Sequence, residues 1–522
     1  MRHAKWSLRS WFDRLLAAHR RTRCRRRFAG PLDCLESRVL LSSIMVQNLN
    51  DSGPGSLRTA VQTANAQPGS DTIEFDNRLR GSIVLTTGQV VISDAVVITG
   101  LGAARLSVSG NNASRIFQIQ PGTTVSISDL SLINGRQTTT DAIGINVIRG
   151  GAILNQGSFL TLDRVTLAGN RAESTGEGFG SANVVGGGAV ANTSQAMLVA
   201  RDCTFRDNTA SGGTSYAFGG AIGNVTDSAA SIYSCHFTQN TVTGALQNYG
   251  GAVGNLGGSS FEAQDSSFVL NRALGVSRGT TDTVNAFGGA IATRPGTLNS
   301  NSGSTRLENC RLISNRAEGA AGTVLNTNTG GMAIGGGVYS LDSSLTVKVS
   351  TIVGNVVQGG AGSREAGSAA GGGIAVQSSP SNTNPVAVSN CLVQGNVVRT
   401  GAGPAAFAQG GGLSLSGTIS IDGTRVIGNV VNGINAEAAQ GGGVYLHQAP
   451  FVLARDARIV GNVILGSSGE GGGLFTTGNV IVRSEVVSQP WRFAQGNVAR
   501  GRIDNLVGTL ISFDPPPGPP QS

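Results

Sequence analysis

The stretch GGGVYLHQAPFVLARDARIVGN, residues 441–462, decides the fold, because it recurs in altered form along most of the chain. Residues 219–240, GGAIGNVTDSAASIYSCHFTQN, follow the same plan. Each stretch opens on a glycine pair, passes through short alternations of apolar and polar residues, and ends at an asparagine. Period-two alternation over about four residues is typical of a short β-strand with one buried face. A phosphate-binding loop is disfavoured, since no helix signal and no Gly-Lys-Ser/Thr follow the glycines.

The closing asparagine marks ten repeats, spaced 31 to 44 residues apart. Repeat periods of this size indicate a solenoid. The asparagines are Asn170, Asn208, Asn240, Asn271, Asn315, Asn355, Asn396, Asn429, Asn462 and Asn497. Three residues before each stands an apolar residue, which in three successive repeats is Phe205, Phe237 and Phe268. We expect both columns to form structural ladders along the stack.

The spacing within a repeat predicts three short strands, two corners of fixed length and one corner of variable length. Six residues before the asparagine stands a corner residue that is often Asn or Asp, which tolerate tight turns. Three strands per turn, stacked in register, make a parallel β-helix with about 4.8 Å between turns. The predicted fold class is all-β: a single-stranded right-handed parallel β-helix of about 11–12 turns with a short N-terminal capping helix.

Four segments follow from these patterns: a basic export leader at 1–43, a cap segment at 44–80, the β-helix at 81–511 and a Pro-rich tail at 512–522. In the cap, Ser56 can begin a helix near 56–66, and Pro68-Gly69 would end it. Such a helix would cover an apolar end and an unpaired strand edge, which would otherwise aggregate.

The net charge of +8 belongs to the leader. Residues 1–43 hold eleven basic and three acidic side chains, whereas the rest of the chain holds 27 of each. A nucleic-acid-binding body would need a basic face with interleaved aromatics, so we expect no nucleic-acid partner. No run of about 18 apolar residues occurs that could span a membrane.

Parts of the chain resemble known protein families. Residues Leu35, Glu36, Arg38, Leu40, Leu41 and Ser42 match the leader of planctomycete-type extracellular proteins, which implies export to the cell surface or beyond. The alternative is a basic tail that binds acidic surfaces. The repeats, with Gly151-Ala152-Ile153 and Phe-x-x-Asn at 205–208, 237–240 and 268–271, resemble those of polymorphic outer-membrane-protein passengers.

The segment at 48–76 resembles the entry motif of bacterial right-handed parallel β-helix proteins. These resemblances imply the pectate-lyase-like fold, but no activity. Polysaccharide lyases of this fold use acidic calcium ligands and an arginine base. The nearest counterpart here is Arg201 and Asp202, with Arg206 and Asp207 in the same turn and Glu262 and Asp265 two turns on. No family motif can be carried over onto them, and the acidic residues already serve corners. We therefore assign no catalytic, cofactor-binding or metal-binding residue. Calcium would be a cofactor only if Arg201, Asp202 and their neighbours formed a lyase site.

Four cysteines, Cys203, Cys235, Cys310 and Cys391, stand in one column that otherwise holds small residues. Cys203 and Cys235 are on adjacent turns and near enough to bridge, but small-residue packing is favoured over a disulfide scaffold.

We expect an exported monomer that works by surface display, adhesion or binding of polysaccharide or other cell-envelope components, through loops on one flank. One alternative is a polysaccharide lyase or glycoside hydrolase. Another is an autotransporter-type passenger, which would need a barrel from another chain.

Overall fold

The computed structural model describes residues 43–139, 147–174, 184–212, 216–277, 283–296, 302–324, 328–434, 436–447, 452–466, 468–482, 494–499 and 502–512. The chain divides into two units, Met1–Leu40 and Leu41–Ser522, and the described residues belong to the second. The leader apart from Ser43, with Cys24 and Cys34, and the Pro-rich tail beyond Ser512 lie outside the described residues.

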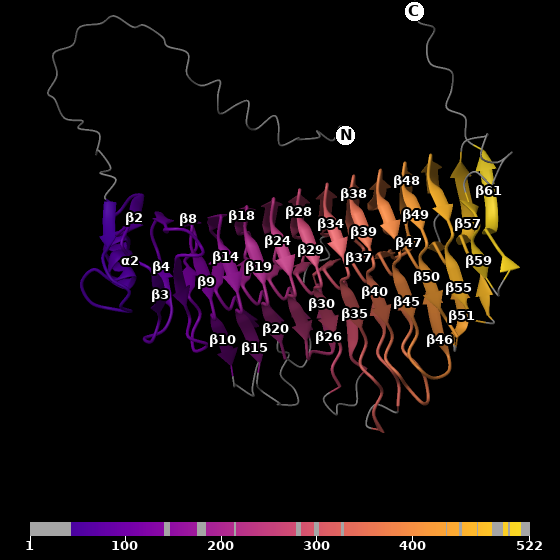
Figure 1. Ribbon diagram of the computed structural model, residues 1–522, viewed down its shortest axis with the longest axis horizontal. Coiled ribbons are helices and arrows are strands. Elements are labelled where there is room, and N and C mark those ends of the chain that lie inside the picture. The colour runs from indigo at the N-terminus through magenta and orange to yellow at the C-terminus, as the bar shows by residue number, and fades with distance from the viewer. Residues whose placement is uncertain are drawn as a thin grey trace, which may run out of the picture. The chain divides into compact units, whose positions relative to one another are not determined.

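One turn of the stack contains five short strands, not the three expected from the sequence. In a central turn these are β22 (Ile222–Asn224), β23 (Ala229–Tyr233), β24 (His236–Thr238), β25 (Thr241–Thr243) and β26 (Gln247–Tyr249). Each pairs in parallel with the equivalent strand of the next turn, for example Phe237 with Phe268. The molecule thus has five parallel ladders, numbered 1 to 5 in this order (Figure 1).

The predicted class, a parallel β-helix, is confirmed. Ladders 1 and 2 share a 26-stranded sheet, while ladders 3, 4 and 5 contain 13, 12 and 10 strands. Ladder 3 runs from β3 (Gly81–Val84) to β58 (Ala494–Gln495), so the stack has slightly more turns than the 11–12 predicted. Ladder 2 also begins earlier than residue 81, since β1 (Ser43–Val46) pairs with β2 (Asp71–Phe75), and β2 pairs with β5 (Val96–Thr99).

The closing asparagines form a continuous buried ladder between ladders 3 and 4. The Asn240 backbone N–H and Nδ2 both donate to Oδ1 of Asn271, at 3.1 and 2.9 Å, and all ten side chains repeat this pattern. Asn505 ends the row by accepting from Asn497. Because buried amides are costly unless hydrogen-bonded, this column admits no other residue easily.

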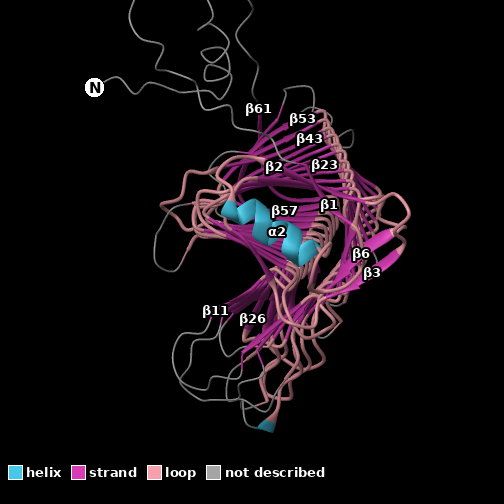
Figure 2. Ribbon diagram, turned by 90° about the vertical axis from the view of Figure 1, so that its left-hand side faces the viewer, coloured by secondary structure: helices cyan, strands magenta, loops and turns pink. Residues whose placement is uncertain are grey.

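The variable corner proved to be a second β-structure. After each asparagine the chain runs outward along ladder 4 and returns along ladder 5, so that the two ladders face each other as a flange standing off the coil (Figure 2). Between them lies a separate core of small residues. It consists of Ala172, Val185, Ala210, Ala217, Val242, Ala245, Ala273, Ala286, Ala317, Ala333, Val357, Ala369, Val398, Ala408, Val431, Ala439, Ile464 and Ala499.

The predicted capping helix is confirmed as α2 (Leu57–Ala66), with Ser56 as its N-cap. Its apolar face is buried, and its polar side chains bond the open edge of ladder 1. Arg58 donates to the carbonyls of Gly88 and Gln89, at 2.6 and 3.0 Å, and Asn65 donates to that of Val91 at 2.8 Å. The helix therefore occupies the backbone acceptors at these positions, which the first strand of ladder 1 would otherwise expose at its open edge.

Candidate functional site

The crease, where ladder 5 of the flange meets ladder 1 of the coil, gathers most of the tyrosines. Its buried cluster comprises Phe218, Val225, Tyr249, Phe287, Ala292, Ile334, Tyr339 and Ala375. Large rings on one ladder face small residues on the other: a side chain on Gly223 would come within 2.7 Å of the Phe218 ring. This complementarity holds the flange at a fixed angle to the coil.

Arg294 lies in the crease against two tyrosine rings. It ends β32 (Ile291–Arg294), and its guanidinium lies 5.2 Å from the centroid of Tyr216 and 5.1 Å from that of Tyr249. Its Nη1 donates to the Tyr249 hydroxyl at 2.9 Å, and that hydroxyl donates to Gln247. Burial raises the pKa of Tyr249 to about 12, so the hydroxyl keeps its proton at neutral pH. Tyr216, Gln247, Tyr249 and Arg294 form the arginine–tyrosine cluster.

Two more arginines enter the crease nearer the N-terminus. Arg115 donates to the carbonyls of Arg149 and Gly150 and to Gln89, at 2.8 to 2.9 Å, and so caps the open edge of ladder 5. Arg149 ends β11 (Val147–Arg149) and donates to the Thr193 hydroxyl at 2.7 Å, across to ladder 1. Its Nε is enclosed and has no acceptor among the described residues. Burial lowers the pKa of Arg115 to about 10 and also lowers that of Arg149.

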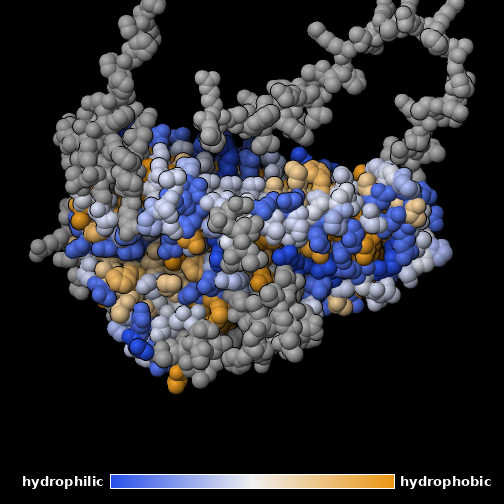
Figure 3. Space-filling view, turned by 180° about the vertical axis from the view of Figure 1, so that it is seen from behind, coloured by the Kyte–Doolittle hydropathy of each residue, from blue (hydrophilic) through white to orange (hydrophobic). Residues whose placement is uncertain are grey.

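Charge is segregated between the faces of the molecule. Every ion pair between described residues lies in the cap or on ladders 2, 3 and 4, as in Arg164–Asp129, Arg306–Glu262 and Arg316–Glu318. The three crease arginines take part in none of them. Figure 3 shows the molecule from behind, with hydrophilic residues along the coil and apolar residues at the C-terminal part of the flange. Phe407, in β46 (Ala406–Gln409) of ladder 5, is exposed.

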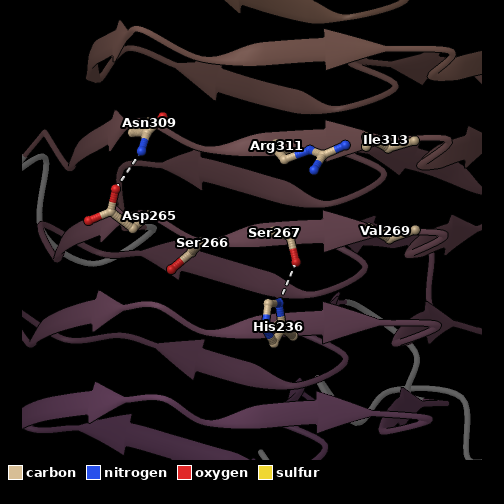
Figure 4. A pocket seen from close by; sticks show the side chains of 8 residues that line it. All are labelled: His236, Asp265, Ser266, Ser267, Val269, Asn309, Arg311 and Ile313. Carbon is tan, nitrogen blue, oxygen red and sulfur yellow. Dashed lines mark hydrogen bonds between the residues drawn. The ribbon is translucent and has the colours of Figure 1, made fainter.

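A shallow depression lies on the outer face of ladder 3 (Figure 4). It brings together the titratable side chains of His236, Asp265 and Arg311. These side chains line the depression but do not point at a common atom. His236 forms a hydrogen bond with Ser267 at 2.8 Å, while Asp265 accepts one from Asn309 of the next turn. This arrangement lacks the acid, base and common target atom that proton abstraction needs.

Arg201 and Asp202 lie at the corner between ladders 2 and 3. Arg201 ends β18 (Met197–Arg201), and its guanidinium lies 5.6 Å from the centre of the Tyr233 ring. Asp202 follows with φ of 51°, and its backbone N–H donates to Tyr233. Both side chains are exposed, and no hydrogen bond or ion pair joins them to the other candidates. The other candidate residues form ion pairs of their own: Arg206 pairs with Asp207, and Glu262 pairs with Arg306.

The four cysteines of the body are buried free thiols. The backbone N–H of Cys203 approaches Sγ of Cys235 at 3.3 Å, and burial raises the pKa of Cys310 and Cys391 to about 11. They pack as small apolar residues. Within the described ranges, no group of three or more His, Cys, Asp or Glu side chains is placed to hold a metal ion. None of the helices in those ranges has the length and apolarity to cross a membrane.

The crease could not be recognised in the sequence, because the members of its buried cluster come from six turns and share no motif. A second asparagine ladder also went unpredicted: Asn155, Asn192 and Asn224 each donate from Nδ2 to Oδ1 of the next asparagine, the last being Asn255, at 2.7 to 2.8 Å. The sequence does carry a signal for this ladder, because each of these asparagines stands two residues after the Ile or Val of a Gly-Ala-Ile/Val motif.

No family model and no curated protein matches the sequence. Solved structures of several proteins match over most of the chain, among them the following three. A GH87 α-1,3-glucanase catalytic domain in complex with nigerose is 12% identical, covers 79% of this chain and 69% of its own, and gives a TM-score of 0.34. PfbA, a surface adhesin of Streptococcus pneumoniae, is 11% identical, with 82% and 87% covered and a TM-score of 0.31. ORF18 of Geobacillus virus E2 is 10% identical, with 84% and 62% covered and a TM-score of 0.29. At these scores the matches carry no argument about activity or ligand.

Proposed function

We propose that this chain is an exported β-helix protein that binds glycans or other cell-envelope components without chemically altering them. The observation that carries the proposal is the arginine–tyrosine cluster. In it a guanidinium is held against two rings, beside amide and hydroxyl groups, and no carboxylate of the described residues pairs with it. Amphipathic rings and rigid hydrogen-bond donors are the groups that recognition surfaces favour. The binding face is then the crease rather than the loops at the tip of the flange.

Catalysis by a lyase or hydrolase is the second candidate. Such chemistry needs an acid and a base positioned around one reacting atom. Neither the depression around His236 nor the corner at Arg201 and Asp202 brings such a pair together. Export remains part of the proposal and rests on the leader sequence.

Two assays on the purified full-length chain test the proposal. The first measures co-sedimentation with isolated cell envelopes and binding to a glycan array. The second incubates the chain with pectate, alginate and neutral glucans, with and without Ca²⁺, and records unsaturated products and new reducing ends. We expect binding without turnover. Turnover that disappears in Arg201→Ala or Asp202→Ala would replace the proposal with the enzyme, and the absence of any binding would remove it.

A further inference from the structure

The three crease arginines form no ion pair with any carboxylate among the described residues. Taking a guanidinium out of water costs free energy unless an anion or a full set of acceptors compensates. Arg115 has acceptors for three of its nitrogens and serves the strand edge. Arg294 has two acceptors among the described residues, Tyr249 and Pro295, for a group that offers five N–H donors. Arg149 donates to one acceptor within the described ranges, the Thr193 hydroxyl.

Arg149 and Arg294, the two guanidiniums with fewer hydrogen-bond acceptors, both lie along the crease. Arg149 reaches Thr193 of β17 (Val190–Thr193), and Arg294 reaches back to Tyr249 of β26, two turns farther along the stack. Two turns correspond to roughly 10 Å at about 4.8 Å per turn. Between them the crease is closed underneath by the buried ring of Phe218, which packs against small residues such as Gly223. Two rigid cationic positions at a fixed spacing are suited to a ligand with repeated negative charges.

We propose that the crease binds an anionic polysaccharide, whose carboxylate or sulfate groups lie at Arg149 and Arg294 and whose sugar ring contacts the half-exposed Tyr216. This inference rests on the proposed function and names its ligand class. Guanidinium can form paired hydrogen bonds with the oxygens of a carboxylate or a similar oxyanion, which suits arginine to this role. On the other faces Arg164, Arg306 and Arg316 are ion-paired. Arg425 and Arg458, on neighbouring strands of ladder 3, are exposed and form no ion pair with a described residue, so an anion bound there would not respond to the crease variants.

The test measures binding of the full-length chain to uronate oligomers of increasing length, a sulfated glycosaminoglycan, a neutral glucan of matched length and a DNA oligonucleotide. The variants are Arg149→Gln, Arg294→Gln and the double variant. The matched control is Arg306→Gln, a half-exposed arginine whose charge is paired with Glu262 and Glu308 on ladder 2. Circular dichroism and unfolding curves verify that each variant is folded. Arg294→Lys keeps the charge if Arg294→Gln fails to fold.

We expect each single crease variant to bind the longer anionic oligomers about tenfold more weakly, as for loss of one charged hydrogen bond. With long oligomers, the loss of affinity in the double variant should equal the sum of the two single losses. With a monosaccharide, which can reach one arginine at a time, the double variant should lose little more affinity than a single variant. Arg306→Gln should bind as wild type. Whether uronate or sulfate binds more tightly identifies the anionic group. Neutral and anionic glycans bound equally well would overturn the inference and leave the proposed function standing. An equal loss in Arg306→Gln, or equal affinity for DNA, would also overturn it. Failure of every glycan to bind would overturn the inference, and co-sedimentation with cell envelopes would then decide separately whether the proposed function stands.

Discussion

At the scale of the residue, the interior of the coil is a set of columns in which each side chain contacts its counterparts above and below. Phe237 lies between Phe205 and Phe268, with ring centroids 4.5 and 4.7 Å away and rings within 9° of parallel. The same column holds Leu167 and Leu312 in other turns. It therefore requires an apolar side chain but not an aromatic one.

Phe237→Asp should lower the free energy of unfolding by at least about 3 kcal/mol, because it places an unpaired charge in a closed column. Phe237→Leu should cost only about 1–2 kcal/mol, since leucine already occupies this column. Chemical unfolding followed by circular dichroism measures both. Equal midpoints for the aspartate variant and wild type would show that the column does not face inward.

The body cysteines should be unreactive in the native state. Burial raises the pKa of Cys310 and Cys391 from 9.0 to about 11, so almost none of either thiol is ionised at neutral pH. Peptide mapping after iodoacetamide treatment at pH 8 should find these thiols unmodified until the chain is unfolded. As pH rises from about 9 towards 11, the unfolded chain ionises first and native stability should fall. Rapid modification of Cys310 at pH 8 would contradict their packing role.

At the scale of the element, the sequence predicted the coil well and the flange poorly. The columns before each asparagine revealed ladders 2 and 3, because their alternation spans several residues at fixed spacing. Ladders 4 and 5 have strands of mostly two to four residues, and their spacing from the next glycine pair varies with the tip loops. Each of these strands buries one residue, such as Ala210 or Ala217. A single buried residue does not produce an alternation that can be detected in one repeat. The crease could not be predicted, because it depends on the angle between two ladders.

The flange should lose its structure without melting the coil, since it has its own core. Ala273 lies in this core, in a column that holds valine at Val242 and Val357. In Ala273→Asp, hydrogen exchange should accelerate in ladders 4 and 5 around that turn, whereas ladders 2 and 3 stay protected. The control, Ala273→Val, should cost about 1 kcal/mol or less. Loss of protection across all five ladders would instead mean that flange and coil unfold together.

At the scale of the whole molecule, the charge divides into a basic leader and a neutral body. Fused to a reporter, residues 1–43 should direct it out of the cytoplasm of the native host. Cell fractionation and protease accessibility measure the location. A reporter without the leader, and one with Leu40 and Leu41 both changed to Asp, serve as controls. Retention of the fusion in the cytoplasm together with nucleic acid would favour a basic tail instead.

The flange also has a mechanical consequence. Seen along its axis, the stack is a rod with an angled cross-section, one limb being the coil and the other the flange (Figure 2). Such a rod is stiffest against bending in the plane of the projecting limb, as an angle girder is. Its neutral axis, where bending produces neither stretching nor compression, runs close to the inner corner. A polymer held in the crease would keep nearly constant spacing between its contacts while the rod flexes under shear.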